Sequence, residues 1–124
     1  MPTPGRRLSF PKEVRLRRRK EFLRVQEKGQ KIDAGLLLAL VLKNQQPLAD
    51  LRVGLTVSAK VGNAVVRNRV RRRLRELFRT RREALPKGLD MVLIARTSAA
   101  KAEWQDFVRA FDRLEAQLQR RYGG

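Results

Sequence analysis

The sequence predicts a single α/β domain, a two-layer α+β sandwich in which helices cover a small central sheet. Its 124 residues suit one hydrophobic core, and 42% of them are apolar. Helix-like and strand-like hydrophobic patterns follow one another in the order α-β-β-α-β-α. We therefore expect one domain over residues 15–122, preceded at residues 1–14 by a basic flexible arm that contains three prolines.

The first helix is expected at residues 17–28. Phe22, Leu23 and Val25 fall at helical spacing, and Gly29 supplies a stop signal. The first helix is therefore expected to be short.

Two strands are expected next, at residues 36–42 and 51–58, joined by a polar segment that contains Pro47. We expect them to pair as an antiparallel hairpin. The second strand alternates, with Val53, Leu55 and Val57 on one face and Gly54, Thr56 and Ser58 on the other. One of these faces should be core, and the other can face a ligand.

A long helix should follow, with Asn63 as its N-cap, ending near Arg82 ahead of Pro86. Residues 89–96 are almost continuously apolar, which predicts a buried strand. The long helix is therefore a crossover between two strands.

A C-terminal amphipathic helix is indicated by apolar residues that recur every three or four positions. They are Trp104, Phe107, Val108, Phe111, Leu114 and Leu118. Its polar face carries both charges, so we expect the helix to pack on the core.

Charge is concentrated in two segments. The chain has 30 Lys and Arg against 12 Asp and Glu, a net charge of +18. Residues 1–31 carry +8 of this charge and residues 60–82 carry +9. A polyanion is the expected partner. Arginine outnumbers lysine 22 to 8, and its planar fork suits phosphates, so nucleic acid is favoured over a membrane surface.

The long helix separates into an apolar and a basic face when its residues are placed about 100° apart. The apolar stripe consists of Val66, Val70, Leu74 and Leu77. The opposite face holds Asn68, Arg71, Arg72, Arg75, Arg79 and Arg82, with Arg67, Arg69 and Arg73 on the flanks. Because like charges repel along a helix, such a face is relieved when it binds a polyanion.

Several chemistries are excluded by composition. The chain has no Cys and no His, so thiolate or imidazole catalysis and the usual zinc sites are unavailable. The longest apolar run spans residues 36–42, too short for a membrane span, and we expect a soluble, cytoplasmic protein. No small-molecule substrate is indicated.

The basic helix and its surroundings carry a family resemblance. Residues 51–79, LRVGLTVSAKVGNAVVRNRVRRRLRELFR, resemble the signature of the bacterial ribonuclease P protein subunit, with its G-N-A-V-x-R-N-R-x-[KR]-R box. The preceding RLRRRKEFLRVQEKG is similar to the family's first helix. The resemblance implies a left-handed βαβ crossover, where the general rule predicts a right-handed one.

The same resemblance implies a function in which the protein is not the catalyst. An RNA subunit with Mg²⁺, bound mainly by that RNA, cleaves the 5′ leader from precursor tRNA, while the protein helps to bind the leader. Residues matching the box would face the catalytic RNA or the substrate near the cleavage site: Lys60, Asn63, Arg67, Asn68, Arg69, Arg71, Arg72 and Arg75. Residues matching the leader cleft are Phe22, Leu38, Leu40, Thr56 and Ser58.

The sequence departs from the family pattern at three positions, and two other functions are considered. Gln26 and Leu40 stand where relatives often have aromatics, and Ala59 where Lys is common, which leaves the leader's base preference open. Phe22, Leu38 and Leu40 could instead be ordinary packing residues. A ribosomal protein or RNA chaperone would explain the charge without the box. A metal-dependent nuclease would need carboxylates from among Glu13, Asp33, Asp50, Asp90, Glu103 and Asp106, which form no recognisable motif.

Overall fold

The computed structural model describes residues 16, 18–44 and 51–123, and the predicted arm at residues 1–14 lies outside them. The helices are α2 (Arg19–Lys28), α3 (Ala64–Arg81) and α4 (Trp104–Tyr122), with short 3₁₀ turns η2 (Arg82–Ala84) and η3 (Thr97–Lys101). The strands are β1 (Gln30–Asp33), β2 (Leu37–Lys43), β3 (Arg52–Thr56) and β4 (Leu89–Ala95). The described part of the chain holds no helix long and apolar enough to cross a membrane.

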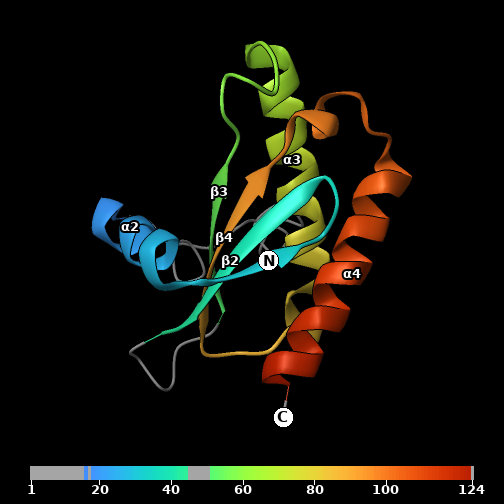
Figure 1. Cartoon of the computed structure of the whole chain (residues 1–124). Coiled ribbons are helices and arrows are strands. Elements are labelled where there is room, and N and C mark those ends of the chain that lie inside the picture. Colours follow the sequence, from blue (N-terminus) through green and yellow to red (C-terminus); the bar gives the residue numbers. More distant parts are fainter. Residues whose placement is uncertain (1–15, 17, 45–50, 124) are drawn as a thin grey trace, which may run out of the picture.

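The strands form one sheet in the order β1-β2-β4-β3 (Figure 1). β2 pairs with β1 and β4 in antiparallel fashion, while β3 pairs with β4 in parallel. In the view of Figure 1, β4 lies to the right of β3. The chain leaves β3, passes behind the sheet as α3, and returns as β4. This is the left-handed sense that the family resemblance implies.

The predicted hairpin between residues 36–42 and 51–58 is wrong, because β4 lies between β2 and β3. All residues of β4 except Ile94 are buried, so this strand occupies the centre of the sheet, where neighbours cover both of its edges. The antiparallel partner on the far side of β2 is β1, a strand that the sequence pattern did not reveal. In β1 only Ile32 is buried, so the segment lacks the apolar alternation of a typical strand.

Helices cover both faces of the sheet. α3 and α4 pack on one face around the main core, which includes Phe78, Phe107 and Phe111. α2 covers part of the other face, where Val25 packs with Leu40 and Val92. The predicted fold class, a small central sheet covered by helices, is confirmed.

The prediction for the C-terminal helix needs one correction. Phe107, Phe111, Leu114 and Leu118 are fully buried, and Val108 packs against the core. Trp104 instead lies on the first turn of α4 with 38% of its surface exposed. On a helical wheel Trp104 lies about 60° from the fully buried Phe107, at the side of the buried stripe, so the apolar spacing overstates its burial.

Candidate nucleic-acid interface

The apolar face of α3 fixes the direction in which its arginines point. Val70, Leu74 and Leu77 are buried and Val66 is partly buried, as the helical spacing predicts, and Phe78 joins them. The helix begins where the Asn63 side chain accepts a hydrogen bond of 3.0 Å from the backbone N–H of Val66. Asn63 is therefore an N-cap, and its side-chain oxygen is already engaged.

The arginines of α3 divide into a paired and an unpaired group. Near the C-terminal end, Arg79 pairs with Glu76, and Arg81 pairs with Asp112 and Glu115 of α4. The Arg79 hydrogen bond holds the pKa of Glu76 below its ordinary value. Nearer the N-terminus, Arg67, Arg71, Arg72 and Arg75 form no ion pair with any described residue. Their positive charge is left uncompensated on the part of the helix between Arg67 and Arg75.

Arg69 and Arg73 have partners of a different kind. Arg69 donates to the backbone carbonyl of Ala100 at 2.8 Å, and Arg73 donates to that of Ala102 at 2.9 Å. The Arg73 guanidinium also lies 5.5 Å from the centre of the Phe107 ring. These two arginines fasten α3 to the segment before α4, yet they keep their full charge because a carbonyl does not neutralise it. Part of the role expected for Arg69 is thus structural.

Asn68 and Arg67 complete this surface. The exposed Asn68 side chain accepts a 3.1 Å hydrogen bond from the half-buried Arg71, which aligns the two side chains. The Nε of Arg67 is buried and finds no partner among the described residues. A buried donor of this kind is costly unless something accepts from it, and a phosphate or base oxygen is a suitable acceptor.

A second feature lies on the sheet face that α2 only partly covers. Leu38, Ile94 and Thr56 are opposite one another on β2, β4 and β3, and all three are half-buried. This row, which we call the open row, lies one step beyond the row that α2 covers. It therefore forms an accessible strip of sheet beside the helix.

Phe22 borders the open row. Its ring lies directly over Gly54 of β3, where a methyl group would overlap it. Phe22 is half-buried, whereas Leu40 is only 6% exposed beneath α2. Of the residues expected in the leader cleft, Phe22, Leu38, Thr56 and Ser58 keep accessible surface. Leu40 keeps little, because it packs beneath α2 with Val25 and Val92.

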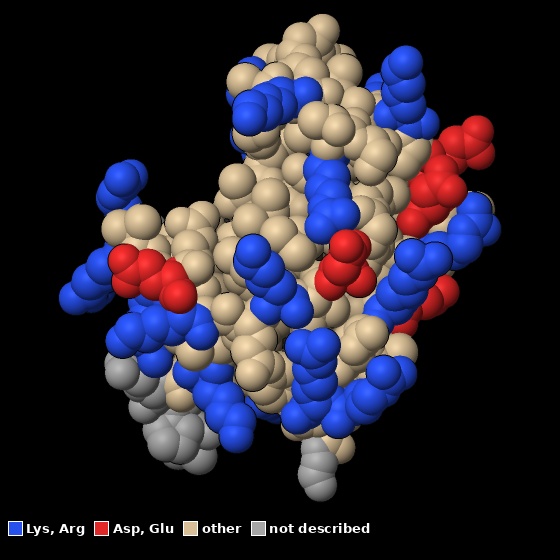
Figure 2. Space-filling view, in the orientation of Figure 1, with Lys and Arg blue, Asp and Glu red and all other residues tan. Residues whose placement is uncertain are grey.

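The open row and the unpaired arginines lie at the same end of the molecule. β3 ends at Thr56, and the chain then passes through the exposed Ser58 and Lys60 to the start of α3. In the view of Figure 2, Lys and Arg side chains are spread widely, whereas a large share of the acidic side chains gathers along the edge formed by α4. The predicted site residues thus form two neighbouring features, a basic helix end and a strip of sheet.

The carboxylates that a nuclease would need are engaged elsewhere. Asp33 accepts from the N–H of Gly35 at 2.9 Å, a bond that lowers its pKa, and it pairs with Arg96. Asp90 is held by Arg52, and Asp106 accepts from the backbone N–H of Glu103. Glu13 and Asp50 lie outside the described residues. In the described ranges no three Asp or Glu residues come together as a metal site would require.

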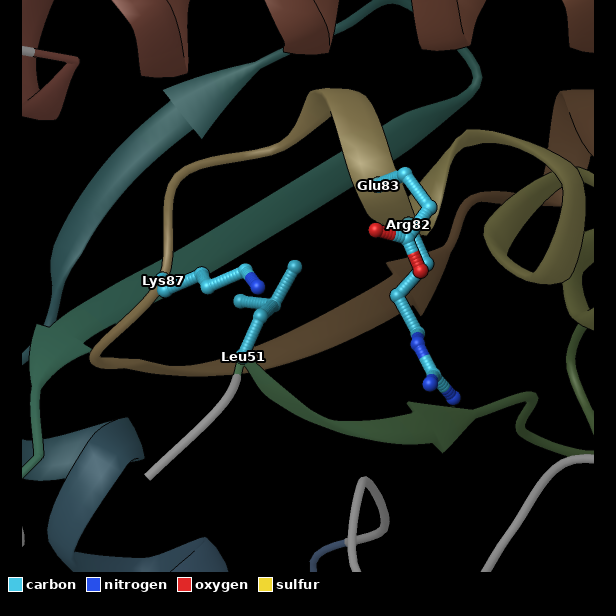
Figure 3. Close-up of a pocket in the computed structure, with 4 residues that line it drawn as sticks. All are labelled: Leu51, Arg82, Glu83 and Lys87. Atoms are coloured by element: carbon cyan, nitrogen blue, oxygen red, sulfur yellow. The ribbon is translucent and has the colours of Figure 1, made fainter. Parts of the chain in front are cut away.

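A small pocket lies beyond the C-terminal end of α3, lined by Leu51, Arg82, Glu83 and Lys87 (Figure 3). Its interior has room for roughly one water molecule. Figure 3 shows the Arg82 and Lys87 side chains on either side of Leu51. The pocket is at the opposite end of α3 from the unpaired arginines, and it is too small for an organic substrate.

The chain is similar to known proteins over most of its length. The family described as Ribonuclease P matches residues 10–119. The ribonuclease P protein component of Desulfovibrio desulfuricans is 42% identical over 115 residues, covering 93% of this chain and 88% of that protein. The protein component of Gluconacetobacter diazotrophicus is 50% identical over 84 residues, covering 66% of this chain and 71% of that protein.

Solved structures resemble the fold. The RNase P protein of Staphylococcus aureus superposes with a TM-score of 0.76 at 27% identity, over 84% of this chain and 94% of its own. That of Thermotoga maritima gives a TM-score of 0.70 at 32% identity, over 86% and 96%.

Proposed function

This chain belongs to the ribonuclease P protein family, and we propose that it is the RNA-binding protein subunit of a ribonuclease P ribonucleoprotein. In this role it binds the RNA subunit and the 5′ leader of precursor tRNA, and it assists Mg²⁺-dependent removal of that leader. Catalysis resides in the RNA, and the protein alone does not cleave.

The observation that carries this proposal is the uncompensated charge on α3 between Arg67 and Arg75. Arg67, Arg71, Arg72 and Arg75 have no carboxylate partner among the residues described, whereas Arg79 does. Surface arginines usually find nearby acids, and a run without them is self-repelling. Phosphates would relieve the repulsion, and each contact would release a condensed counterion. The arrangement therefore favours a nucleic-acid backbone as the ligand.

The open row supports a role in binding a single strand. Its half-buried side chains, Leu38, Ile94 and Thr56, form a mainly apolar floor, and Phe22 adds an aromatic ring at its border. Unpaired bases stack on aromatic rings and lie on apolar surfaces, at roughly 1 to 3 kcal/mol per stacked base. A leader segment could thus place its bases on the strip while its phosphates approach the start of α3.

Magnesium is assigned to the RNA partner in this proposal. The described residues offer no cluster of carboxylates for it, so no step is assigned to a metal on the protein. The protein's contribution is charge. Each phosphate that an arginine neutralises needs one less cation from solution, and we expect the RNA to work at lower Mg²⁺ when the protein is present.

The test is cleavage of precursor tRNA at low Mg²⁺ by a bacterial ribonuclease P RNA, with the protein present, with it absent, and with the protein alone. We expect cleavage only when RNA and protein are combined. Cleavage by the protein alone would revive the nuclease alternative. Binding without any increase in cleavage would favour the general RNA-binding alternative.

A further inference from the structure

The first turn of α4 presents an aromatic side chain that the core does not use. Trp104 is the single tryptophan of the chain, and 38% of its surface is exposed. The other aromatic residues of this helix before its last turn, Phe107 and Phe111, are fully buried. A large aromatic left at the surface of a basic protein is a candidate contact for a ligand.

Trp104 lies on the flank of α4 that faces α3. On a helical wheel it is about 20° from Glu115, and Glu115 pairs with Arg81 of α3 at 3.8 Å. The two helices run side by side in the same direction (Figure 1). Arg73 of α3 reaches the chain on both sides of Trp104, through the Ala102 carbonyl and the Phe107 ring.

Glu103 and Asp106 lie beside Trp104 at the start of α4, but the arginines of α3 make its α3 side a favourable place for RNA. Arg69 and Arg73 are fixed by backbone carbonyls and keep their charge, and Arg72 is exposed with no ion pair to a described residue. A strand whose phosphates follow these arginines passes the first turn of α4. An unpaired base at that point can stack on the indole ring, which is a sequence-tolerant contact.

We propose that Trp104 is a stacking platform for an unpaired nucleobase of the ribonuclease P RNA subunit. The base comes from the RNA subunit rather than from the leader, because α4 and the leader strip lie on opposite faces of the sheet. The inference rests on the proposed function and adds a second RNA contact to it, separate from Phe22.

Tryptophan fluorescence tests this directly, because Trp104 is the sole tryptophan. The full chain is titrated with ribonuclease P RNA while binding is followed independently by filter retention. Stacking predicts that the fluorescence is quenched in step with binding, and that adding precursor tRNA to the saturated complex causes little further change. Binding without quenching overturns the stacking contact and leaves the proposed function standing. Failure to bind overturns both. Quenching that appears only with precursor tRNA would assign the base to the leader and overturn the proposal as stated.

Three variants separate stacking from general loss of surface. Trp104→Phe keeps a ring and should bind within about twofold of the original chain. Trp104→Leu keeps apolar bulk without a ring and should weaken RNA binding roughly tenfold. Gln105→Ala, at the exposed neighbouring position, is the matched control and should have no effect. Equal affinity of the Leu and Phe variants would overturn the proposal, and unchanged thermal unfolding of all three would show that the effect is on binding.

Discussion

Arg52 forms a bidentate ion pair with Asp90. Its Nε and one terminal nitrogen each donate a 2.8 Å hydrogen bond to a different carboxylate oxygen. The other terminal nitrogen lies 2.7 Å from Glu21. The three residues come from β3, β4 and α2, so one guanidinium joins the helix to two strands. Asp90 is 1% exposed, and the hydrogen bonds that its carboxylate accepts from Arg52 raise the pKa of Arg52.

Arg52→Ala should lower the free energy of unfolding by about 3 kcal/mol, because it leaves the Asp90 carboxylate buried without its partner. Urea unfolding would measure the loss. Arg24→Ala is the control: its guanidinium is 4.0 Å from Asp90 and more exposed, and we expect a loss below about 1 kcal/mol. Equal losses in the two variants would contradict the special role of Arg52.

Gly54→Ala should destabilise the packing of α2 on the sheet, because the new methyl group overlaps the Phe22 ring. Overpacking of this kind costs about 1 to 3 kcal/mol. In a Phe22→Ala background the ring is gone, and the same substitution should cost much less. A double-mutant cycle by urea unfolding measures the coupling, and strictly additive losses would show that the two residues do not meet.

Lowering the pH should destabilise the start of α4, because it protonates the Asp106 carboxylate. Its carboxylate accepts from the N–H of Glu103 at 2.8 Å, and this bond lowers the pKa of Asp106 from its ordinary value of 3.8. The stabilisation is therefore fully present above pH 3.8 and is lost as pH falls through the lower folded-state pKa. Asp106→Asn keeps an oxygen acceptor that does not titrate. Its melting temperature should fall less than that of the original chain between pH 5 and pH 2.5, and parallel curves would contradict the assignment.

The sequence was most informative about α3. Asn63 as the N-cap and the stripe from Val66 to Leu77 follow from local hydrogen bonding and helical spacing, and the structure confirms both. The strand order could not be predicted in the same way. β1 contains only one buried apolar residue, Ile32, and it is held by its pairing with β2 rather than by its own composition.

The site was predictable by residue type but less so by role. Spacing places Arg69 with the other basic residues, yet its carbonyl partner is Ala100, 31 positions away in the sequence. Leu38 and Leu40 are two positions apart on β2 and therefore share one face of the strand. α2 nevertheless covers only Leu40. Trp104 satisfies the apolar spacing of α4 and still remains exposed. Each difference depends on which element lies above a residue, and local patterns carry no such information.

Phe22→Ala should weaken binding of leader-bearing precursor tRNA to the assembled holoenzyme more than binding of mature tRNA. The expected difference is roughly tenfold, since one stacking contact is lost. Phe22→Tyr keeps the ring and serves as the control. Because Phe22 also packs over Gly54, truncation has a folding cost, which the mature tRNA measurement reveals. An equal loss of affinity for both ligands would show that Phe22 acts only in packing and does not contact the leader.

Arg71→Ala combined with Arg75→Ala should weaken assembly with the RNA subunit and flatten its salt dependence. Neither arginine has a carboxylate partner among the residues that the structure describes, so both are available to phosphates. Losing two phosphate contacts should reduce the slope of log K against log salt by about 1.5.

The matched control is Arg79→Ala with Arg81→Ala, which removes the same formal charge from the same helix. These two arginines already pair with Glu76 and Asp112, so they are less available to phosphates, and their removal should change the number of released counterions little. We expect a slope change less than half as large. If both double variants flatten the slope equally, net charge alone governs binding, and the unpaired arginines of α3 are not a defined RNA surface. A larger effect of the first pair would locate phosphate contacts at Arg71 and Arg75.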